Sequence, residues 1–524
     1  MTSLVQAKLC TADEAISLIE SGSTLVSGGF VGAAHAEALT SALERRFLAT
    51  GIPNALTLVY GAGQGDGKSR GLNHLAHPKL LRRVIGGHWG LAPRLGELAI
   101  DDQIEAYNFP QGVICQLLRD IAAGRPGTVT RVGLGTFIDP AHGGGRLNRR
   151  TIQALVERIE LGGTTWLFYR SMPLHVGLIR ASAADSNGSL LMDQEAIIGE
   201  VLQIAQAVHN CGGTVIAQVK QLVDGAANPH AVVVPGMLVD RIVLSQPNDH
   251  DQTFAESFNP AFCEPAHDSA SAGRITAARS MPSDERRIIA CRACDELAAG
   301  SIANLGIGMP EGIARIAFER GLLGTVTLTV ESGPIGGMPA GGLSFGASNH
   351  PHAIVDQPAQ FDFYDGGGLD YAALGAAQID RQGNVNVSKF GQRFVGVGGF
   401  VNIAQNARKL IFCGTLTAGD LEVAVTHGKL SIIREGANRK FVEAVEQVCF
   451  SAARDTYRAT QVLYVTERAV FQLTEAGLEL IEVAPGIDIE SQVVAAMGFR
   501  PLMREVRPMP ASCFTATSGN ERRS

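Results

Sequence analysis

One carboxylate, Glu331, stands where a buried strand is expected to end and a glycine-rich segment to begin. Residues 325–330 alternate β-branched and apolar side chains, a pattern typical of a buried strand. The glycines that follow let a backbone approach a ligand closely, and ligands bind at the carboxyl ends of strands in open α/β sheets. Glu331 is therefore predicted to face a crevice as a nucleophile or a base. The alternative is a carboxylate that only caps the next turn.

A second candidate is Gln111, within the run Asn-Phe-Pro-Gln-Gly at 108–112. Pro110 suits the start of a helix, so Gln111 is expected in the first helical turn. Its amide can then donate a hydrogen bond into a crevice. A solvated amide in the first turn is the alternative.

A second glycine loop, Gly-Val-Gly-Gly at 396–399, follows the cations Lys389 and Arg393. Glycine loops of this kind can hold phosphates with backbone N–H groups. The neighbouring cations favour a phosphate near this loop. Exposed, solvated charges are the alternative.

Other chemistries fit the sequence less well. The carboxylates and histidines around Glu331 lack the spacing of a metal site, so no metal is expected. Cys291 and Cys294 form a C-x-x-C motif inside a helical pattern with no second pair, which predicts buried helix thiols. Glycines alternate over 61–67 after a strand, but the spacing differs from the dinucleotide fingerprint.

The elements that position these residues alternate between strands and helices, which predicts an α/β fold with mostly parallel sheets. The second half repeats the first. Residues 21–30 resemble 299–308, and residues 56–63 resemble 326–333, so that Glu331 corresponds to Gly61. Asp-Ser-Asn-Gly at 185–188 resembles Asp-Arg-Gln-Gly at 380–383. We expect two similar open α/β domains with the active site at their interface, where ligand pockets are common.

The domain boundaries are placed by composition. We expect an N-terminal domain over 1–250, a polar linker over 251–282, a C-terminal domain with the reactive glutamate over 283–510 and a mobile tail over 511–524. A chain of 524 residues is too long for one ordinary core.

Composition excludes several classes of protein. A net charge of −7 with scattered cations argues against a nucleic-acid surface. Nine cysteines without regular spacing indicate a reducing compartment. With no signal pattern and no apolar run of about 18 residues, a soluble cytoplasmic protein is expected.

Several motifs together resemble the family I coenzyme A transferases. They are Glu-Ser-Gly-Pro-Ile-Gly-Gly-Met-Pro at 331–339, Phe-Gly-Ala-Ser-Asn at 345–349, Phe-Asp-Phe-Tyr-Asp-Gly-Gly-Gly-Leu-Asp at 361–370, Gly-Gly-Phe at 28–30, Val-Ile-Gly-Gly-His-Trp-Gly at 84–90, Asn-Phe-Pro-Gln-Gly at 108–112 and Gly-Leu-Gly-Thr-Phe-Ile-Asp-Pro at 133–140. The sequence is most similar to the single-chain acetate/propionate type, in which an α-like and a β-like half are fused. The resemblance extends from about residue 12 to residue 500.

This resemblance implies a ping-pong transfer of CoA between short-chain acyl-CoA and free carboxylates, among them acetate, propionate, butyrate and lactate. Glu331 matches the family's catalytic glutamate, which attacks the thioester and then carries CoA as a glutamyl-CoA thioester. Gln111 matches an active-site glutamine, and Gly398 a backbone donor. The resemblance also implies substrate or CoA contacts for a further set of residues: Gly306, Gly308, Gly333, Asn349, Lys389, Gly396 and Gly399.

The resemblance further implies that CoA enters as a substrate, that no cofactor is bound, and that the protein is a homo-oligomer, a dimer or a tetramer. An acyl-CoA hydrolase using the same intermediate is the nearest alternative. A ligand-sensing regulator on a related fold is a remote one, because no basic helix-turn-helix segment is present to bind DNA. Neither nucleic acid nor membrane is expected as a partner.

Overall fold

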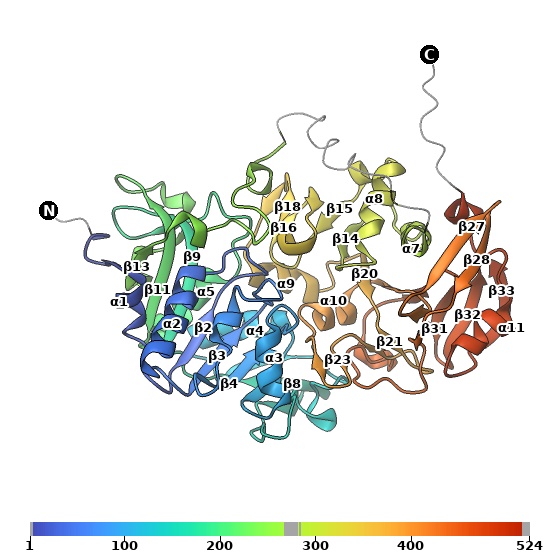
Figure 1. Cartoon of the computed structure of the whole chain (residues 1–524), viewed down its shortest axis with the longest axis horizontal. Helices are drawn as coiled ribbons and strands as arrows, with labels where there is room; N and C mark the ends of the chain where they lie inside the picture. Colours follow the sequence, from blue (N-terminus) through green and yellow to red (C-terminus); the bar gives the residue numbers. More distant parts are fainter. Residues whose placement is uncertain (1–3, 267–280, 282–283, 516–524) are drawn as a thin grey trace, which may run out of the picture. The chain divides into compact units, whose positions relative to one another are not determined.

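The computed structural model of the chain describes residues 4–266, 281 and 284–515 (Figure 1). They form two compact units. Unit 1 comprises residues 1–268, 329–366 and 388–402, and unit 2 comprises residues 269–328, 367–387 and 403–524. Segments 329–366 and 388–402, from the second half of the sequence, therefore belong to the unit that contains the first half.

Unit 1 is built on a sheet whose eight main strands are all parallel to their neighbours. In spatial order these strands are β1 (Leu9–Cys10), β13 (Arg241–Leu244), β11 (Thr214–Leu222), β9 (Val176–Ala184), β2 (Thr24–Ser27), β3 (Leu56–Tyr60), β4 (Leu81–Gly86) and β5 (Glu105–Asn108). The short strands β10 (Leu190–Leu191) and β12 (Val232–Val234) add an antiparallel edge. Strands β2, β3 and β9 are buried along their whole length, as expected for a parallel sheet covered on both faces.

Helices and smaller sheets complete unit 1. Its helices are α1 (Ala12–Ile16), α2 (Glu37–Thr50), α3 (Pro93–Ile100), α4 (Gln111–Ala122), α5 (Val201–Asn210) and α9 (Gln357–Asp365). A three-stranded antiparallel sheet has the order β6 (Gly127–Thr130), β8 (Thr164–Arg170), β7 (Val156–Leu161). The short strands are β16 (Pro334–Ile335), β17 (Met338–Pro339), β18 (Ser348–Asn349), β19 (Ala353–Ile354), β23 (Lys389–Phe390) and β24 (Arg393–Phe394).

Unit 2 contains a mixed sheet. The strands of this sheet that lie wholly in unit 2 have the order β14 (Ile302–Leu305), β20 (Tyr371–Gly375), β25 (Lys409–Cys413), β30 (Gln461–Val465), β31 (Ala469–Thr474), β32 (Gly477–Val483) and β33 (Leu502–Pro508). The first four are parallel, and β31 is antiparallel to both of its neighbours. Its helices are α7 (Glu285–Cys294), α8 (Glu311–Glu319) and α11 (Ile489–Gln492), and a hairpin is formed by β27 (Glu422–Thr426) and β28 (Lys429–Arg434). The strand β15 (Thr327–Thr329) and the helix α10 (Phe400–Asn406) span sequence borders between the units.

The predicted α/β class with mostly parallel sheets is confirmed. Two of the sequence segments that resemble each other also share local backbone features. Gly28 directly follows β2, and its N–H donates to Leu178 O at 3.1 Å; Gly306 directly follows β14, and its N–H donates to Ala373 O at 2.8 Å. Each glycine thus continues a parallel ladder at the same point of its own sheet. Gly188 and Gly383 both have positive φ, and their N–H groups bond to the carbonyls of Asp185 and Asp380.

Some predicted elements differ from the structure. The sequence pattern predicts a helix over 194–209, but α5 begins at Val201 because Gly199 adopts a φ of +66° and Glu200 is the N-cap. The acidic and aromatic residues of 357–370 predict a helix end and a loop, but residues 357–365 form the whole of α9. Its N-cap Asp356 accepts from Ala359 N at 2.7 Å.

The predicted linker and tail fall partly outside the described residues, at 267–280, 282–283 and 516–524. Within the part that is described, Phe262 is buried in a short 3₁₀ helix, Pro260–Phe262. The tail begins with a second 3₁₀ helix, η11 (Ala511–Phe514), in which Cys513 and Phe514 are buried. Two apolar side chains thus hold the start of the tail against unit 2.

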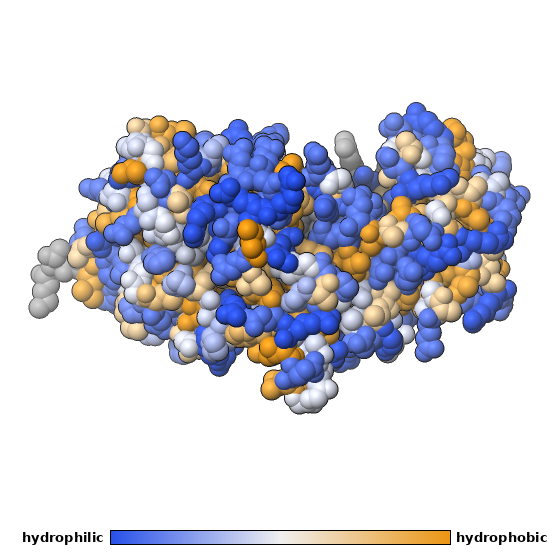
Figure 2. Space-filling model, turned by 90° about the horizontal axis from the view of Figure 1, so that it is seen from below, coloured by the Kyte–Doolittle hydropathy of each residue, from blue (hydrophilic) through white to orange (hydrophobic). Residues whose placement is uncertain are grey.

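The exposed surface carries dispersed apolar side chains. The face shown in Figure 2 is mostly hydrophilic, with hydrophobic groups dispersed between hydrophilic ones. Exposed apolar residues come from separate elements: Leu48, Ile152, Leu161, Met237 and Ile433. No helix among the described residues has both the length and the apolar character that crossing a bilayer requires.

Candidate active site

Glu331 lies two residues beyond the end of β15, at the start of a tight turn. Val330 N donates to Pro334 O at 3.0 Å, and Gly333 N donates back to Val330 O at 3.0 Å. Gly333 has a φ of +125°, and a Cβ there would lie 2.0 Å from Val355 O, so only glycine fits. Glu331 itself is partly exposed. The turn therefore presents a carboxylate at a strand's carboxyl end, as the sequence predicts.

Gln111 is the first residue of α4, as predicted, and only 2% of its surface is exposed. Its backbone N–H donates to Gly398 O at 2.9 Å. Its side-chain Nε2, in contrast, has no hydrogen-bond partner among the residues that the structure describes. An unpaired buried donor is costly, which indicates that it is kept for a ligand or a water.

The loop at 396–399 packs against the segment that follows β4. His88 and Gly396 form a β-bridge, and Trp89 N donates to Val395 O at 2.7 Å. Gly396 has a φ of +79°, and a Cβ on it would lie 2.9 Å from Gly87 O. The predicted Gly396 and Gly398 thus lie beside the predicted Gln111, all within unit 1.

The backbone N–H of Gly398, which the resemblance implies as a donor at the active site, is already bonded within the protein. It donates to Gly87 O at 2.8 Å, so in this conformation it holds two loops together. A Cβ on Gly398 would lie 3.5 Å from Gln111 Oε1, which places the glycine next to that amide. The side chain of Gln111 is the predicted donor that stays unpaired here.

Asn108, quoted in the Pro-Gln motif but given no role from the sequence, joins these loops. Its Nδ2 donates to Gly86 O at 2.8 Å and to Gly87 O at 2.6 Å. Its Oδ1 accepts from Val397 N at 3.1 Å. The side chain is fully buried. Its position at the end of a strand, three residues before Gln111, is the signal that could have identified it.

A buried polar cluster surrounds Gly61, the position that corresponds to Glu331 in the first half. A Cβ on Gly61 would lie 3.4 Å from Cys115 Sγ, 3.5 Å from Gln357 Nε2 and 3.6 Å from Glu200 Oε1. Gln357 Nε2 donates to Cys115 Sγ at 3.0 Å. Cys115 follows Gln111 by one helical turn on α4. Nothing in the sequence pointed to Glu200, which lies inside a predicted helix.

Electrostatics at this cluster and at His88 are governed by burial. Burial raises the pKa of Glu200 to about 8, so that its carboxyl group is protonated at neutral pH. Burial also raises the pKa of Cys115, with the charge of Glu200 adding to the effect. It lowers the pKa of His88 to about 4, so this imidazole is neutral.

The remaining predicted residues are distributed more widely. Lys389 Nζ lies 5.7 Å from the centre of the Phe394 ring, across the β23–β24 hairpin. Asn349 Nδ2 donates to Met338 O at 3.3 Å between β18 and β17. Gly306 and Gly308 belong to unit 2, where Gly308 N donates to Glu311 Oε1 at 3.0 Å.

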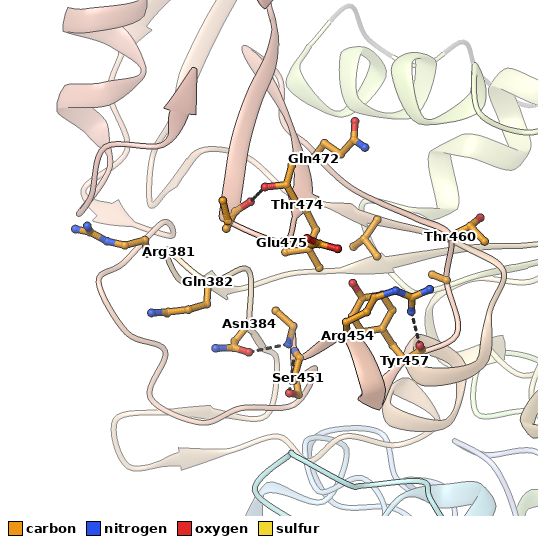
Figure 3. A pocket seen from close by; sticks show the side chains of 17 residues that line it. Arg381, Gln382, Asn384, Ser451, Arg454, Tyr457, Thr460, Gln472, Thr474 and Glu475 are labelled. Carbon is orange, nitrogen blue, oxygen red and sulfur yellow. Dashed lines mark hydrogen bonds between the residues drawn. The ribbon is translucent and has the colours of Figure 1, made fainter. Parts of the chain in front are cut away.

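Unit 2 also contains an open groove of about 830 Å³, shown in Figure 3. Its polar groups are largely engaged with their surroundings. Ala452 N donates to Asn384 Oδ1 at 2.8 Å, Thr474 donates to Gly477 O at 2.8 Å, and Arg454 donates to Tyr457 O at 2.9 Å. None of the predicted site residues lines it. Across the described part of the chain, no three His, Cys, Asp or Glu side chains are grouped to hold a metal ion.

Comparisons with known proteins show which family the chain resembles. The family model for coenzyme A transferase matches residues 10–245. The acetate CoA-transferase YdiF of Escherichia coli K12 is 40% identical over 94% of this chain and 92% of its own length. The caffeate CoA-transferase of Acetobacterium woodii is 40% identical over 97% of this chain and 98% of its own length.

Solved structures give the same result. The crystal structure of acyl-CoA transferase YdiF from E. coli O157:H7 has a TM-score of 0.91 and 38% identity, and covers 98% of this chain and 97% of its own. A second structure of that protein, described as a thioester complex with CoA, has a TM-score of 0.90. The chain therefore belongs to the coenzyme A transferase family, as an enzyme of the single-chain type.

Proposed function

We propose that the enzyme transfers CoA between short-chain acyl-CoA and free short-chain carboxylates through a glutamyl-CoA thioester on Glu331. The observation that carries this mechanism is the position of Glu331, a partly exposed carboxylate held at the end of β15 by a turn that only glycine permits. Acetate follows from the name of the E. coli relative. Propionate and butyrate follow from the resemblance to the acetate/propionate type.

The reaction is a sequence of acyl exchanges. The carboxylate of Glu331 attacks the thioester carbonyl and expels CoA as a thiolate. The acyl group is then joined to Glu331 as a mixed anhydride. The thiolate then attacks the glutamyl carbonyl, which releases the free acid and forms the glutamyl-CoA thioester. An incoming carboxylate reverses these steps. Covalent catalysis of this kind exchanges one thioester for another without ATP or a metal ion.

Each tetrahedral intermediate develops an oxyanion that needs aimed donors. The unpaired Nε2 of Gln111 is our proposed side-chain donor, because it is buried and already lies beside the loop at 396–399. For the N–H of Gly398 to join it, the bond to Gly87 O must lengthen or be shared. We propose substrate or CoA contacts for the other glycines, Asn349 and Lys389 on the resemblance alone.

The first test is to trap the intermediate. The full chain is incubated with acetyl-CoA without an acceptor, reduced with borohydride and mapped by mass spectrometry. Modification of Glu331, and its loss in Glu331→Gln, is the expected result. An unmodified Glu331 in protein that binds acetyl-CoA would overturn the mechanism.

The acceptor is then identified by adding acetate, propionate, butyrate or caffeate to the unreduced intermediate. Caffeate is included because a relative of equal identity is named for it. Formation of the corresponding acyl-CoA is expected for at least one short-chain acid. Release of free CoA alone would show that the enzyme is a hydrolase.

The oligomeric state is a separate measurement. Light scattering of the same preparation measures whether the protein is the dimer or tetramer that we propose.

A further inference from the structure

The two cysteines of the C-x-x-C motif are buried on α7, as predicted, but the partner of Cys291 is not Cys294. The Cys291 sulfur instead shares a hydrogen bond with the Cys513 thiol, on η11. Cys291 Sγ also lies 3.7 Å from Ser512 O. Because Ser512 directly precedes Cys513, the contact with Ser512 O places Cys513 beside Cys291 inside unit 2, although the two cysteines are more than two hundred residues apart in sequence.

A cation also bonds to Cys291. Arg320, at the end of α8, donates from Nη2 to Cys291 Sγ at 3.0 Å. Its Nη1 bonds to Asp295 Oδ1 at 2.7 Å, which fixes the guanidinium in this position. One turn earlier on α7, Arg287 bonds to Glu319 at 2.7 Å. A guanidinium within hydrogen-bond distance of a sulfur favours the thiolate form.

The two thiols are therefore chemically different. The hydrogen bond from Cys513 lowers the pKa of Cys291 to about 7 with the help of Arg320, against the opposing effect of burial. The same hydrogen bond and burial raise the pKa of Cys513. Burial also raises the pKa of Cys294, to about 11. The cluster therefore contains one acidic thiol, Cys291, whose sulfur accepts hydrogen bonds, and one protonated thiol, Cys513, beside it.

We propose that Cys291 and Cys513 form an oxidisable pair, in which Cys291 reacts with hydrogen peroxide and Cys513 resolves the product to a disulfide between α7 and η11. An activated thiolate next to a resolving thiol is the arrangement found at sites of reversible oxidation. Both side chains are 5% exposed, which suits an oxidant as small as peroxide.

The two steps balance. The Cys291 thiolate attacks one peroxide oxygen, an S–O bond forms, the O–O bond breaks and hydroxide leaves. The Cys513 thiol then attacks the sulfur of the sulfenic acid, an S–S bond forms, and the sulfenic oxygen leaves as water with the thiol proton. The two thiols lose two electrons in total, and one peroxide is reduced to water and hydroxide.

The test uses the full chain, reduced and then treated with hydrogen peroxide. Peptide mapping under non-reducing conditions should find the Cys291 and Cys513 peptides linked. In Cys513→Ser, Cys291 should instead be trapped as a sulfenic acid by dimedone. The matched control Cys294→Ser should still form the linked peptides.

Reactivity provides a second measurement that does not depend on disulfide formation. Iodoacetamide should alkylate Cys291 faster than Cys294 at neutral pH, by on the order of tenfold or more, because the thiolate is the nucleophile. Arg320→Gln should slow alkylation of Cys291. A Cys291–Cys294 linkage, or a Cys291 that reacts no faster than Cys294 in the folded protein, would overturn the proposal. Because neither readout uses CoA transfer, the result is independent of the function proposed above.

Discussion

At the scale of single residues, the unpaired Nε2 of Gln111 gives the sharpest expectation. Gln111→Ala should lower kcat by about 10²- to 10³-fold, the usual effect of losing one oxyanion donor. The matched control is Gln116→Ala on the same helix, where the amide bonds to Asp365 at 3.0 Å. Steady-state assays with acetyl-CoA and propionate measure both variants. Equal kcat values for the two variants would show that Gln111 is not a donor in the transition state.

Glu200 makes the stability of the fold fall as pH rises from 4.5 to about 8. Its carboxyl group has an ordinary value of 4.5 and a folded pKa of about 8, so between these values the folded state holds a proton that the unfolded state has lost. Its contribution to the free energy of unfolding therefore falls as pH rises through this window, by roughly 1.4 kcal/mol per pH unit.

Glu200→Gln removes this titration while keeping the shape of the side chain. The free energy of unfolding of the variant should exceed that of the native chain at pH 8, and this advantage should be lost near pH 5. Urea unfolding at several pH values measures the difference. Parallel pH profiles for both proteins would mean that Glu200 is ionised in the folded state.

At the scale of elements, the loops around Gln111 are held by backbone conformations that few residues adopt. Gly396→Ala places a Cβ 2.9 Å from Gly87 O at a φ of +79°. We expect a loss of about 1–3 kcal/mol in stability together with lower kcat, because the strained loop moves away from α4. Gly96→Ala is the control, since its nearest neighbour would be 3.9 Å away inside a helix and φ is ordinary. Chemical denaturation should find Gly96→Ala neutral or slightly stabilising; a neutral Gly396→Ala would contradict the strain.

The strands and the glycines after them were predictable because each has a local signature. β3 and β15 follow from alternating β-branched residues, and the start of α4 follows from Pro110. The role of Asn108 could not be predicted from the sequence, because its three hydrogen bonds reach segments that are distant in sequence. The same holds for Glu200, whose unusual pKa arises from tertiary burial rather than from neighbouring residues.

At the scale of the whole molecule, buried charge networks should make the protein sensitive to acid. Burial alone would raise the pKa of Glu195, but Arg180 and His250 outweigh it and lower the value to about 2. At Glu37, burial also acts to raise the pKa, but the hydrogen bond from His74 and other favourable contacts outweigh it, so the pKa is lowered to about 2. These carboxylates contribute stability above their ordinary value of 4.5, and that contribution is lost as pH falls towards 2.

Glu195→Gln tests this network. Near pH 7 the variant should lose about 3–5 kcal/mol, because it leaves Arg180 buried without its partner. The deficit should shrink towards pH 2, where the native carboxylate is protonated as well. Glu490→Gln, at an exposed pair with Arg500, is the control and should change stability by under about 1 kcal/mol. A deficit that stays constant from pH 7 to pH 2 would contradict the assignment.

The composition of unit 1 also sets the order of events during synthesis. Its three segments end at residue 402, so the ribosome must complete more than three quarters of the chain before this unit has all its parts. Until then the nascent chain lacks α9 and the loop at 396–399, and the first turn of α4 has no partner for Gln111 N. Such late, sequence-distant contacts slow folding and prolong the exposure of apolar surface. Chaperone dependence should therefore be greatest while residues 250–402 are being made.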